Sequence, residues 1–198
     1  MGRGWRHVNR RAAFHSEDGY RLAGRRPLAR TGDWTSHEEV RDAASALEST
    51  HRLVRIAKAL GKRIHVLHVT TKEEMIFLAA NKDVASVEVT PQHLTLTAPE
   101  AYERLKGYAQ MNPPIRNKYH QDGLWDALAA GVADVLGSDH APHPKEEKAR
   151  PYPASPPGMP GVQPPVPGMP THVANGRPPM ARFVALTTKG HNDPLGMA

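Results

Sequence analysis

The chain has 198 residues, of which 39% are hydrophobic, 6% aromatic and 23% charged, and none is cysteine. This composition is typical of a folded globular domain, and the absence of cysteine excludes disulfides, thiolate metal sites and thiol nucleophiles. The net charge of +6 lies entirely within residues 1–30, where eight arginines face two acidic residues.

The N-terminal segment, residues 1–7, is basic. A nucleic-acid-binding module usually spreads its basic residues along a face with interleaved aromatic side chains, so we expect a solvated segment and no nucleic-acid partner. The segment lacks the apolar stretch of a signal peptide, and no apolar run approaches the roughly 18 residues that a membrane helix needs. We therefore expect a cytoplasmic protein without a membrane span.

Four apolar runs of strand length occur along the chain, at residues 8–14, 63–69, 85–90 and 133–138. Nearly continuous apolar runs of this kind are typical of parallel strands that are covered on both faces. The sequence therefore predicts four strands of one parallel sheet.

Helical patterns fill the intervals between these strands. Ser36-x-x-Glu39 has the pattern of a capping box, and apolar residues at helical spacing follow it, so we predict one helix over residues 36–61. Further helices are predicted to open at Thr71 and Thr97 and to cover residues 118–130 and 180–189. Strands that alternate with helices predict an α/β fold with right-handed crossovers.

The segment 142–179 holds 13 of the 19 prolines of the chain. We predict that it is a long loop with neither helix nor strand, because prolines interrupt both. Loops of this length inside a compact domain are usually either functional or disordered.

Three side chains that suit metal binding stand at the ends of predicted strands. His15 follows the first strand, His68 closes the second and Asp139 closes the last. The carboxyl ends of parallel strands meet at one pole, where α/β barrels collect their active sites, and imidazole and carboxylate groups both suit zinc. His65 precedes His68 by three residues and faces the other side of the strand, so we expect it to be packed or hydrogen-bonded instead.

Seven short blocks occur in a specific order along the chain. They are His15-Ser16-Glu17-Asp18, Leu67-His68-Val69-Thr70-Thr71, Val89-Thr90-Pro91-Gln92-His93-Leu94, Met111-Asn112-Pro113-Pro114-Ile115-Arg116, Gly137-Ser138-Asp139-His140-Ala141-Pro142-His143, Glu146-Glu147-Lys148 and Ser155-Pro156-Pro157-Gly158-Met159-Pro160-Gly161. Together they resemble the cyclic amidohydrolases, and most of all the dihydroorotases of the class that also resembles allantoinase and hydantoinase. The resemblance runs from about residue 8 to the end and weakens after Gln163.

The resemblance implies an α/β fold that is part of a TIM-like (β/α) barrel of the metal-dependent hydrolase type. The chain would supply strands five to eight with their helices, in one partial barrel domain over residues 1–198. The segment 142–179 would be the loop region of the active site.

The resemblance also implies roles for individual residues. In the family, the positions of His15 and His68 bind one zinc ion, and the position of Asp139 binds a second zinc ion and acts as the catalytic base. The substrate contacts that the resemblance implies are Asn112, His143, Pro157 and Gly158.

Several features of the family have no counterpart in this sequence. The chain contains no His-x-His triplet, which in the family follows the first strand. It also lacks two other residues that the family carries on earlier strands, namely the bridging lysine or aspartate and the arginine that binds the substrate. We therefore expect weak zinc binding and little turnover by the chain alone, as for the C-terminal half of a barrel. An open half barrel also leaves strand edges unpaired, so we expect the chain to form a homo-oligomer or to aggregate.

The function implied by the resemblance is the zinc-dependent hydrolysis or formation of a cyclic amide. The favoured reaction interconverts dihydroorotate and N-carbamoyl-L-aspartate in pyrimidine biosynthesis, and allantoinase or hydantoinase activity is the alternative within the same class. An alternative of another class is a non-catalytic chain that supports the assembly of aspartate carbamoyltransferase. The retention of His15, His68 and Asp139 argues against a long-standing loss of catalysis.

Overall fold

A computed structural model describes residues 11–161, 165–177 and 179–188, and its centre is one parallel sheet. The strands are β1 (Ala12–Phe14), β2 (Ile64–Val66), β3 (Ala85–Val89) and β4 (Val135–Leu136), and they lie side by side in that order. All neighbouring pairs are parallel, which confirms the prediction of four strands in one parallel sheet. Each strand is shorter than its predicted run, and residues 8–10 lie outside the described residues.

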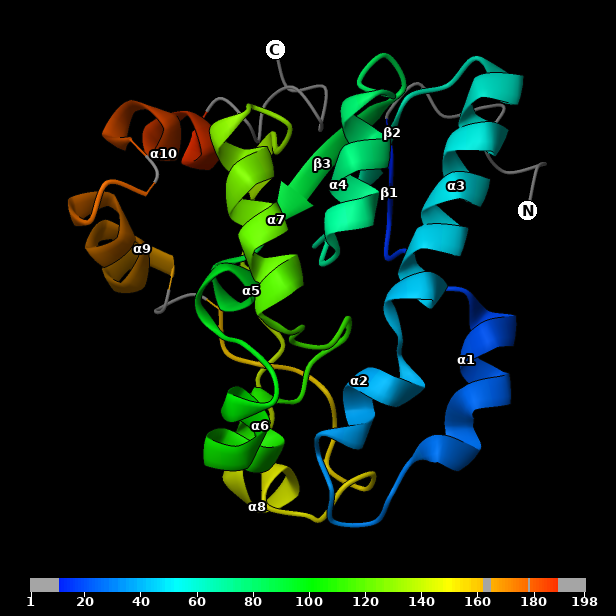
Figure 1. Ribbon diagram of the computed structural model, residues 1–198, viewed down its shortest axis with the longest axis vertical. Coiled ribbons are helices and arrows are strands. Elements are labelled where there is room, and N and C mark those ends of the chain that lie inside the picture. Colours follow the sequence, from blue (N-terminus) through cyan, green and yellow to red (C-terminus); the bar gives the residue numbers. More distant parts are fainter. Residues whose placement is uncertain (1–10, 162–164, 178, 189–198) are drawn as a thin grey trace.

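The outer face of the sheet is covered by helices α3 (Ala43–Leu60), α4 (Lys72–Ala79) and α7 (Lys118–Ala129), which stand in front of the strands in Figure 1. The core between these layers consists of fully buried aliphatic side chains, among them Val54, Ile64, Val66, Met75, Leu78, Val87, Val89 and Leu128. The sheet and these three helices therefore form a rigid base that fixes where each strand ends.

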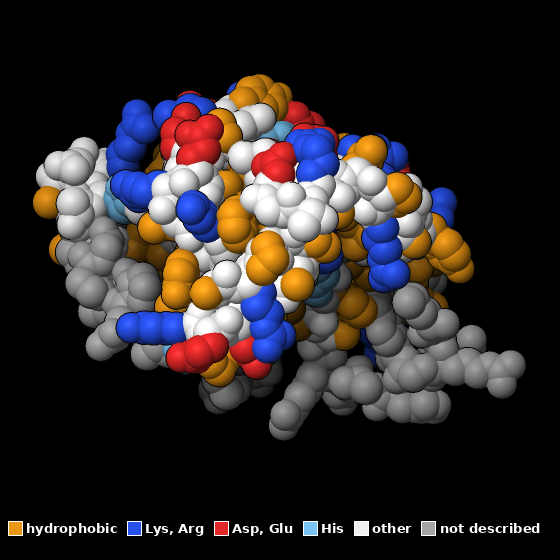
Figure 2. Space-filling view, turned by 90° about the horizontal axis from the view of Figure 1, so that it is seen from below, with side chains coloured by type: hydrophobic (Ala, Val, Ile, Leu, Met, Phe, Trp, Pro, Cys, Tyr) orange, Lys and Arg blue, Asp and Glu red, His pale blue; other side chains and the backbone are white. Residues whose placement is uncertain are grey.

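The remaining helices connect this base to its carboxyl pole and to the C-terminal part of the chain. They are α1 (Gly19–Arg25), η2 (Arg26–Leu28), α2 (Ser36–Val40), α5 (Pro91–Thr95), α6 (Glu100–Leu105), η3 (Lys106–Ala109), α8 (Lys145–Lys148), α9 (Pro165–Ala174) and α10 (Met180–Thr187). The arrow of β3 points toward the end of the molecule that carries α1, α2, α6 and α8 (Figure 1). Figure 2 looks onto this end and shows lysine and arginine side chains interspersed with aspartate and glutamate.

The single helix predicted over residues 36–61 is in fact two helices, α2 and α3. The helix is interrupted at Asp42, because the carboxylate of Asp42 accepts a hydrogen bond from the backbone N–H of Ser45 (3.0 Å) and so caps the start of α3. The capping box predicted at Ser36 does not form, since the hydroxyl of Ser36 donates instead to the carbonyl of Asp33 (2.6 Å).

The prediction that residues 142–179 contain neither helix nor strand is wrong, because both α8 and α9 lie within this segment. Pro165 and Pro167 fall in the first turn of α9, where the backbone N–H groups have no acceptor within the helix. Proline at these positions therefore removes no helical hydrogen bond. Among the described residues of the segment, those outside the two helices are 142–144, 149–161 and 175–177, together with Pro179.

The other predicted helices are present with small shifts. The side chain of Thr71 caps α4 as predicted, and α7 and α10 occupy the predicted positions. The helix predicted to open at Thr97 begins only at Glu100, because Ala98 is extended and bridges to Asn117. No helix in the described part of the chain is long and apolar enough to cross a membrane. The basic segment 1–7 lies outside the described residues.

Candidate metal centre and active site

Polar side chains gather just beyond the carboxyl ends of three strands. His15 is the residue after β1, His68 lies two residues after β2, and Asp139 lies three residues after β4. His68 and Asp139 have left-handed backbone angles, with φ of 35° and 42°. Such angles cost non-glycine residues about 1–3 kcal/mol and persist where the surrounding structure holds them, as is common at functional sites.

The two imidazole rings of this pole meet directly. Nδ1 of His15 lies 3.2 Å from Nε2 of His68, and the ring planes are inclined at 71° with centroids 4.8 Å apart. Two nitrogens bound to one zinc ion at about 2.05 Å and a near-tetrahedral angle lie about 3.3 Å apart. The separation of the two ring nitrogens therefore fits a shared metal ion.

The ring of His15 is held on its far side by a buried carboxylate. Nε2 of His15 donates to Oε2 of Glu17 over 2.6 Å, and the side chain of Glu17 is only 1% exposed. Arg41 pairs with the same carboxylate, its Nε lying 3.1 Å from each oxygen and its Nη2 also donating to Oε2. Burial acts to raise the pKa of Glu17, but the hydrogen bonds and charges of His15 and Arg41 outweigh it and lower that pKa.

His68 is buried and keeps one ring nitrogen without a hydrogen-bond partner among the described residues, namely Nδ1. Burial lowers the pKa of His68, the charge of His15 lowers it further, and the carboxylates of Asp139 and Glu88 act in the opposite direction. The backbone N–H of His68 donates to Oε1 of Glu88 over 3.2 Å, which holds the loop after β2 against β3. His68 is therefore a neutral imidazole near neutral pH, the form that binds metals.

Two of the three predicted metal ligands, His15 and His68, are thus brought into contact, and the charge of the third, Asp139, acts on His68. Within residues 11–161, 165–177 and 179–188, no group of three or more histidine, aspartate or glutamate side chains is arranged to hold a metal ion. The residues present fit two donor positions of a zinc site, those of His15 Nδ1 and His68 Nε2. The assignment of Asp139 as a ligand and base stays a prediction.

Two further histidines of the pole are structural. His65 is buried, with Nδ1 2.9 Å from the hydroxyl of Ser86, in agreement with the packed role expected for it. His93 is also buried, with Nδ1 2.7 Å from Oγ1 of Thr90 and Nε2 3.0 Å from the carbonyl of Pro113. Because its second nitrogen faces that carbonyl, His93 ties the loop that carries Asn112 to the end of β3.

The residues predicted to contact substrate lie on loops that pack against each other. The N–H of Gly158 donates to the carbonyl of Gln110 (2.8 Å), two residues from Asn112. Gly158 has φ of 147°, and a Cβ there would lie 2.4 Å from the carbonyl oxygen of Ala141 and 3.1 Å from the ring of His143. Only glycine allows this approach, so the structure brings His143, Gly158 and the Asn112 loop together.

The exposure of these residues differs. The amide oxygen of Asn112 is buried and has no hydrogen-bond partner in the described part of the chain. His143 is partly exposed and has Nδ1 3.5 Å from a carboxylate oxygen of Glu147. Pro157 is exposed, and Gly158 is buried. The role of all four in substrate binding stays a prediction.

A lysine for which the sequence predicted no role holds these loops in place. Lys148 is 4% exposed, and its Nζ donates to the carbonyls of Gln110 (3.0 Å), Pro156 (2.9 Å) and Gly158 (2.8 Å). Burial lowers the pKa of Lys148 to about 8, so it still carries its charge at pH 7. Its place in the block Glu146-Glu147-Lys148 was the only signal in the sequence.

Arg116 holds the segment that carries Arg41. Its buried guanidinium donates through Nη1 to the carbonyl of Arg41 and through Nε to the hydroxyl of Thr70 (3.3 Å). The loop between α2 and α3 is thereby anchored to the turn after β2. No pattern in the sequence indicated that Arg41, outside every quoted block, would reach Glu17.

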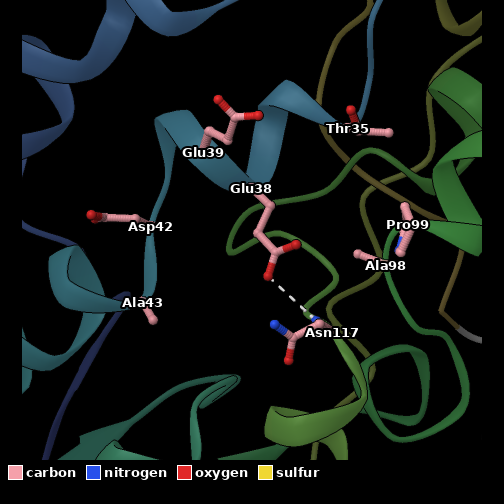
Figure 3. A pocket seen from close by; sticks show the side chains of 8 residues that line it. All are labelled: Thr35, Glu38, Glu39, Asp42, Ala43, Ala98, Pro99 and Asn117. Atoms are coloured by element: carbon pink, nitrogen blue, oxygen red, sulfur yellow. Dashed lines mark hydrogen bonds between the residues drawn. The ribbon is translucent and has the colours of Figure 1, made fainter.

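Two cavities lie near the pole. One of about 540 Å³ is lined by Phe14, His15, Glu17, Tyr20, Leu53 and Ile56 among others, so it opens beside the candidate metal centre along the outer side of β1. The second, of about 450 Å³, is acidic: Glu38 extends into it toward Asn117, whose backbone N–H it accepts at 3.3 Å (Figure 3). The other two carboxylates of that cavity, Glu39 and Asp42, pair with arginines outside it, and it contains none of the predicted site residues.

Comparison with known proteins places this geometry in a family. No family model matches the chain. It is 33% identical over 187 residues to the dihydroorotase of Methanosarcina mazei, covering 89% of this chain and 41% of that protein. It is 39% identical over 124 residues to the dihydroorotase of Staphylococcus epidermidis, covering 61% of this chain and 29% of the relative.

Solved structures of hydantoinases have a fold similar to that of this chain. The L-hydantoinase (dihydropyrimidinase) of Arthrobacter aurescens superposes with a TM-score of 0.86 at 26% identity, over 93% of this chain and 43% of that one. The D-hydantoinase of a Thermus species gives 0.86 at 28% identity over the same shares. The chain spans about two fifths of the length of the curated relatives that it matches. Its four-stranded parallel sheet corresponds to a part of the barrel of these proteins, and the chain is a dihydroorotase-like member of the cyclic amidohydrolase family.

Proposed function

We propose that the protein acts in the zinc-dependent opening or closing of a cyclic amide, and that its substrate pair is dihydroorotate and N-carbamoyl-L-aspartate. The observation that carries this proposal is the convergence of His15 Nδ1 and His68 Nε2 at 3.2 Å, beyond the carboxyl ends of parallel strands. The similarity to dihydroorotases over 89% of the chain supports the choice of substrate. The reaction belongs to pyrimidine biosynthesis, and we propose a cytoplasmic location for it.

The residues of the chain would divide the chemistry among them. His15 and His68 would hold the zinc ion, which when bound lowers the pKa of a water molecule to about 7 and polarises an amide carbonyl. Asp139, which lies after β4 on the same pole, would take a proton from the attacking water and deliver it to the ring nitrogen that leaves. In the direction of ring closure, the carbamoyl nitrogen would attack the side-chain carboxyl carbon of the substrate, and the same carboxylate would carry the proton of that nitrogen to the oxygen that leaves as hydroxide.

The loop residues would bind the rest of the substrate. Asn112 and His143 would donate hydrogen bonds to a substrate carboxylate, and the backbone of Pro157 and Gly158 would contact the ring. The packing of Gly158 on His143 and of the Asn112 loop on Gly158 supports a common substrate-binding surface. Lys148 would keep that surface in shape through its three carbonyl contacts.

The test is a segment exchange. The stretch of the Methanosarcina mazei dihydroorotase that aligns with this chain is replaced by this chain, and the hybrid is assayed for ring opening of dihydroorotate. We expect turnover that Asp139→Asn and His68→Ala abolish, while Glu39→Gln leaves it unchanged. A folded hybrid without turnover on any cyclic amide would contradict the proposal.

Hydantoinase activity is the second candidate, because the solved structures cited above are hydantoinases with TM-scores of 0.86. The same hybrid distinguishes the two substrate classes. Faster opening of hydantoin or dihydropyrimidine rings than of dihydroorotate would replace our substrate assignment and keep the reaction class.

A non-catalytic role in assembling aspartate carbamoyltransferase is the alternative from another class. It predicts that the chain co-sediments with that transcarbamoylase and binds no zinc. Zinc binding that depends on His15 and His68 would count against it.

A further inference from the structure

The ring of His15 contacts His68 through Nδ1 and the carboxylate of Glu17 through Nε2. The position of this carboxylate is more constrained than that of a carboxylate in a surface ion pair. Oε2 of Glu17 lies 2.6 Å from Nε2 of His15, and the side chain is 1% exposed. Arg41 is 20% exposed and reaches both oxygens of the carboxylate, so Glu17 cannot rotate away without breaking a bidentate pair.

This contact determines which nitrogen of His15 carries the proton. An ionised carboxylate can only accept hydrogen bonds, so the nitrogen that faces it must be the donor. The proton of a neutral His15 then lies on Nε2, and Nδ1 keeps its lone pair. Nδ1 is the atom that faces Nε2 of His68 at 3.2 Å.

We propose that Glu17, held by Arg41, is a positioning residue that keeps the proton of His15 on Nε2 and turns the lone pair of Nδ1 toward Nε2 of His68. This inference rests on the proposed function only where it concerns metal binding. The position of the proton is a property of the chain without metal.

The loop that carries Arg41 is itself fixed. The buried guanidinium of Arg116 donates to the carbonyl of Arg41 and lies 3.5 Å from the carbonyl of Asp42. The contacts therefore run in order from Arg116 to Arg41, then to Glu17 and His15. Each link joins segments that are distant in the sequence, so the orientation of His15 depends on the assembled pole.

The first measurement is made on the metal-free chain. Nitrogen-15 NMR of the ring of His15 reports which nitrogen is protonated, at a pH where the ring is neutral. We expect the proton on Nε2, with slow exchange, in the wild type. In Glu17→Ala we expect fast exchange and a mixture of the two neutral forms. In Glu17→Gln, whose amide oxygen can still accept, we expect partial recovery of the wild-type signal.

The second measurement is the affinity for Zn²⁺ alone, by competition with a chromophoric chelator. We expect Glu17→Ala to weaken binding by about 10- to 100-fold, as is usual when the outer partner of a ligating histidine is lost, and Glu17→Gln to weaken it less. Glu39→Ala is the matched control, because Glu39 also pairs with an arginine, Arg30, and takes no part in the contacts that run from Arg116 to His15. Thermal melting establishes that each variant is folded.

The outcomes separate this inference from the proposed function. A wild-type proton on Nδ1, or Glu17→Ala with wild-type exchange and wild-type affinity for Zn²⁺, would overturn the positioning role. A wild-type chain with the proton held on Nε2 and released in Glu17→Ala would support that role even if Zn²⁺ failed to bind. In that case the metal-dependent function would fall and the inference would stand.

Discussion

Lys148→Met removes the three hydrogen bonds that hold the substrate loops together while keeping the apolar stem of the side chain. Nζ of Lys148 donates to the carbonyls of Gln110, Pro156 and Gly158 at 3.0, 2.9 and 2.8 Å. The carbonyl of Gln110 keeps its hydrogen bond from the N–H of Gly158 in the variant. The carbonyls of Pro156 and Gly158 lose the donor that Lys148 supplied.

The expected loss follows from these two acceptors. A buried polar group left without its partner costs about 1–3 kcal/mol, so two of them correspond to about 2–6 kcal/mol of unfolding free energy. Methionine retains the packing of the lysine stem, so the change measures the hydrogen bonds rather than a cavity. We also expect proteolysis near Gly158 to become faster, because the loop opens more often.

The assay is urea unfolding at pH 7, where Lys148 is charged, with Lys145→Met as the control. Lys145 lies on the same helix, α8, and is exposed. A difference between the two variants below about 0.5 kcal/mol, the usual size of a surface substitution, would refute the reasoning.

Further measurements test other parts of the structure. Burial lowers the pKa of His37 to about 4, so on acidification the unfolded chain protonates this histidine before the folded chain does, and the unfolding free energy falls as the pH drops from about 6.5 to 4. His37→Gln should reduce this slope by about 1.4 kcal/mol per pH unit in urea melts at several pH values. Gly161→Ala places a Cβ 1.9 Å from the carbonyl oxygen of Ser138 and should lower the unfolding free energy by about 2 kcal/mol, whereas Gly24→Ala meets nothing within 4 Å and should not lower it. In the described sheet β1 and β4 each pair on one side only, and we expect sedimentation to show dimers or larger species; a clean monomer would contradict this. The chain alone should bind zinc weakly and turn over little dihydroorotate, and metal analysis showing two zinc ions per chain together with rapid turnover would contradict that expectation.

The main elements of the fold could be predicted from the sequence because they depend on local patterns. The four parallel strands followed from apolar runs that alternate with helical segments, and Thr71 caps α4 as its local pattern predicted. The break at Asp42 was missed, since the helical spacing of apolar residues continues through it. The first turn of α9 was missed because proline composition alone does not reveal where a helix begins.

The sequence by itself determined that His15, His68 and Asp139 follow strands. Because the strands are parallel, these positions lie at the same pole of the sheet. Only the tertiary structure decided what surrounds them. Arg41 reaches Glu17 across 24 positions of the sequence, and Lys148 reaches Gln110 across 38. Such contacts depend on how loops pack once the sheet has formed, and a local pattern carries no information about a partner that far along the chain.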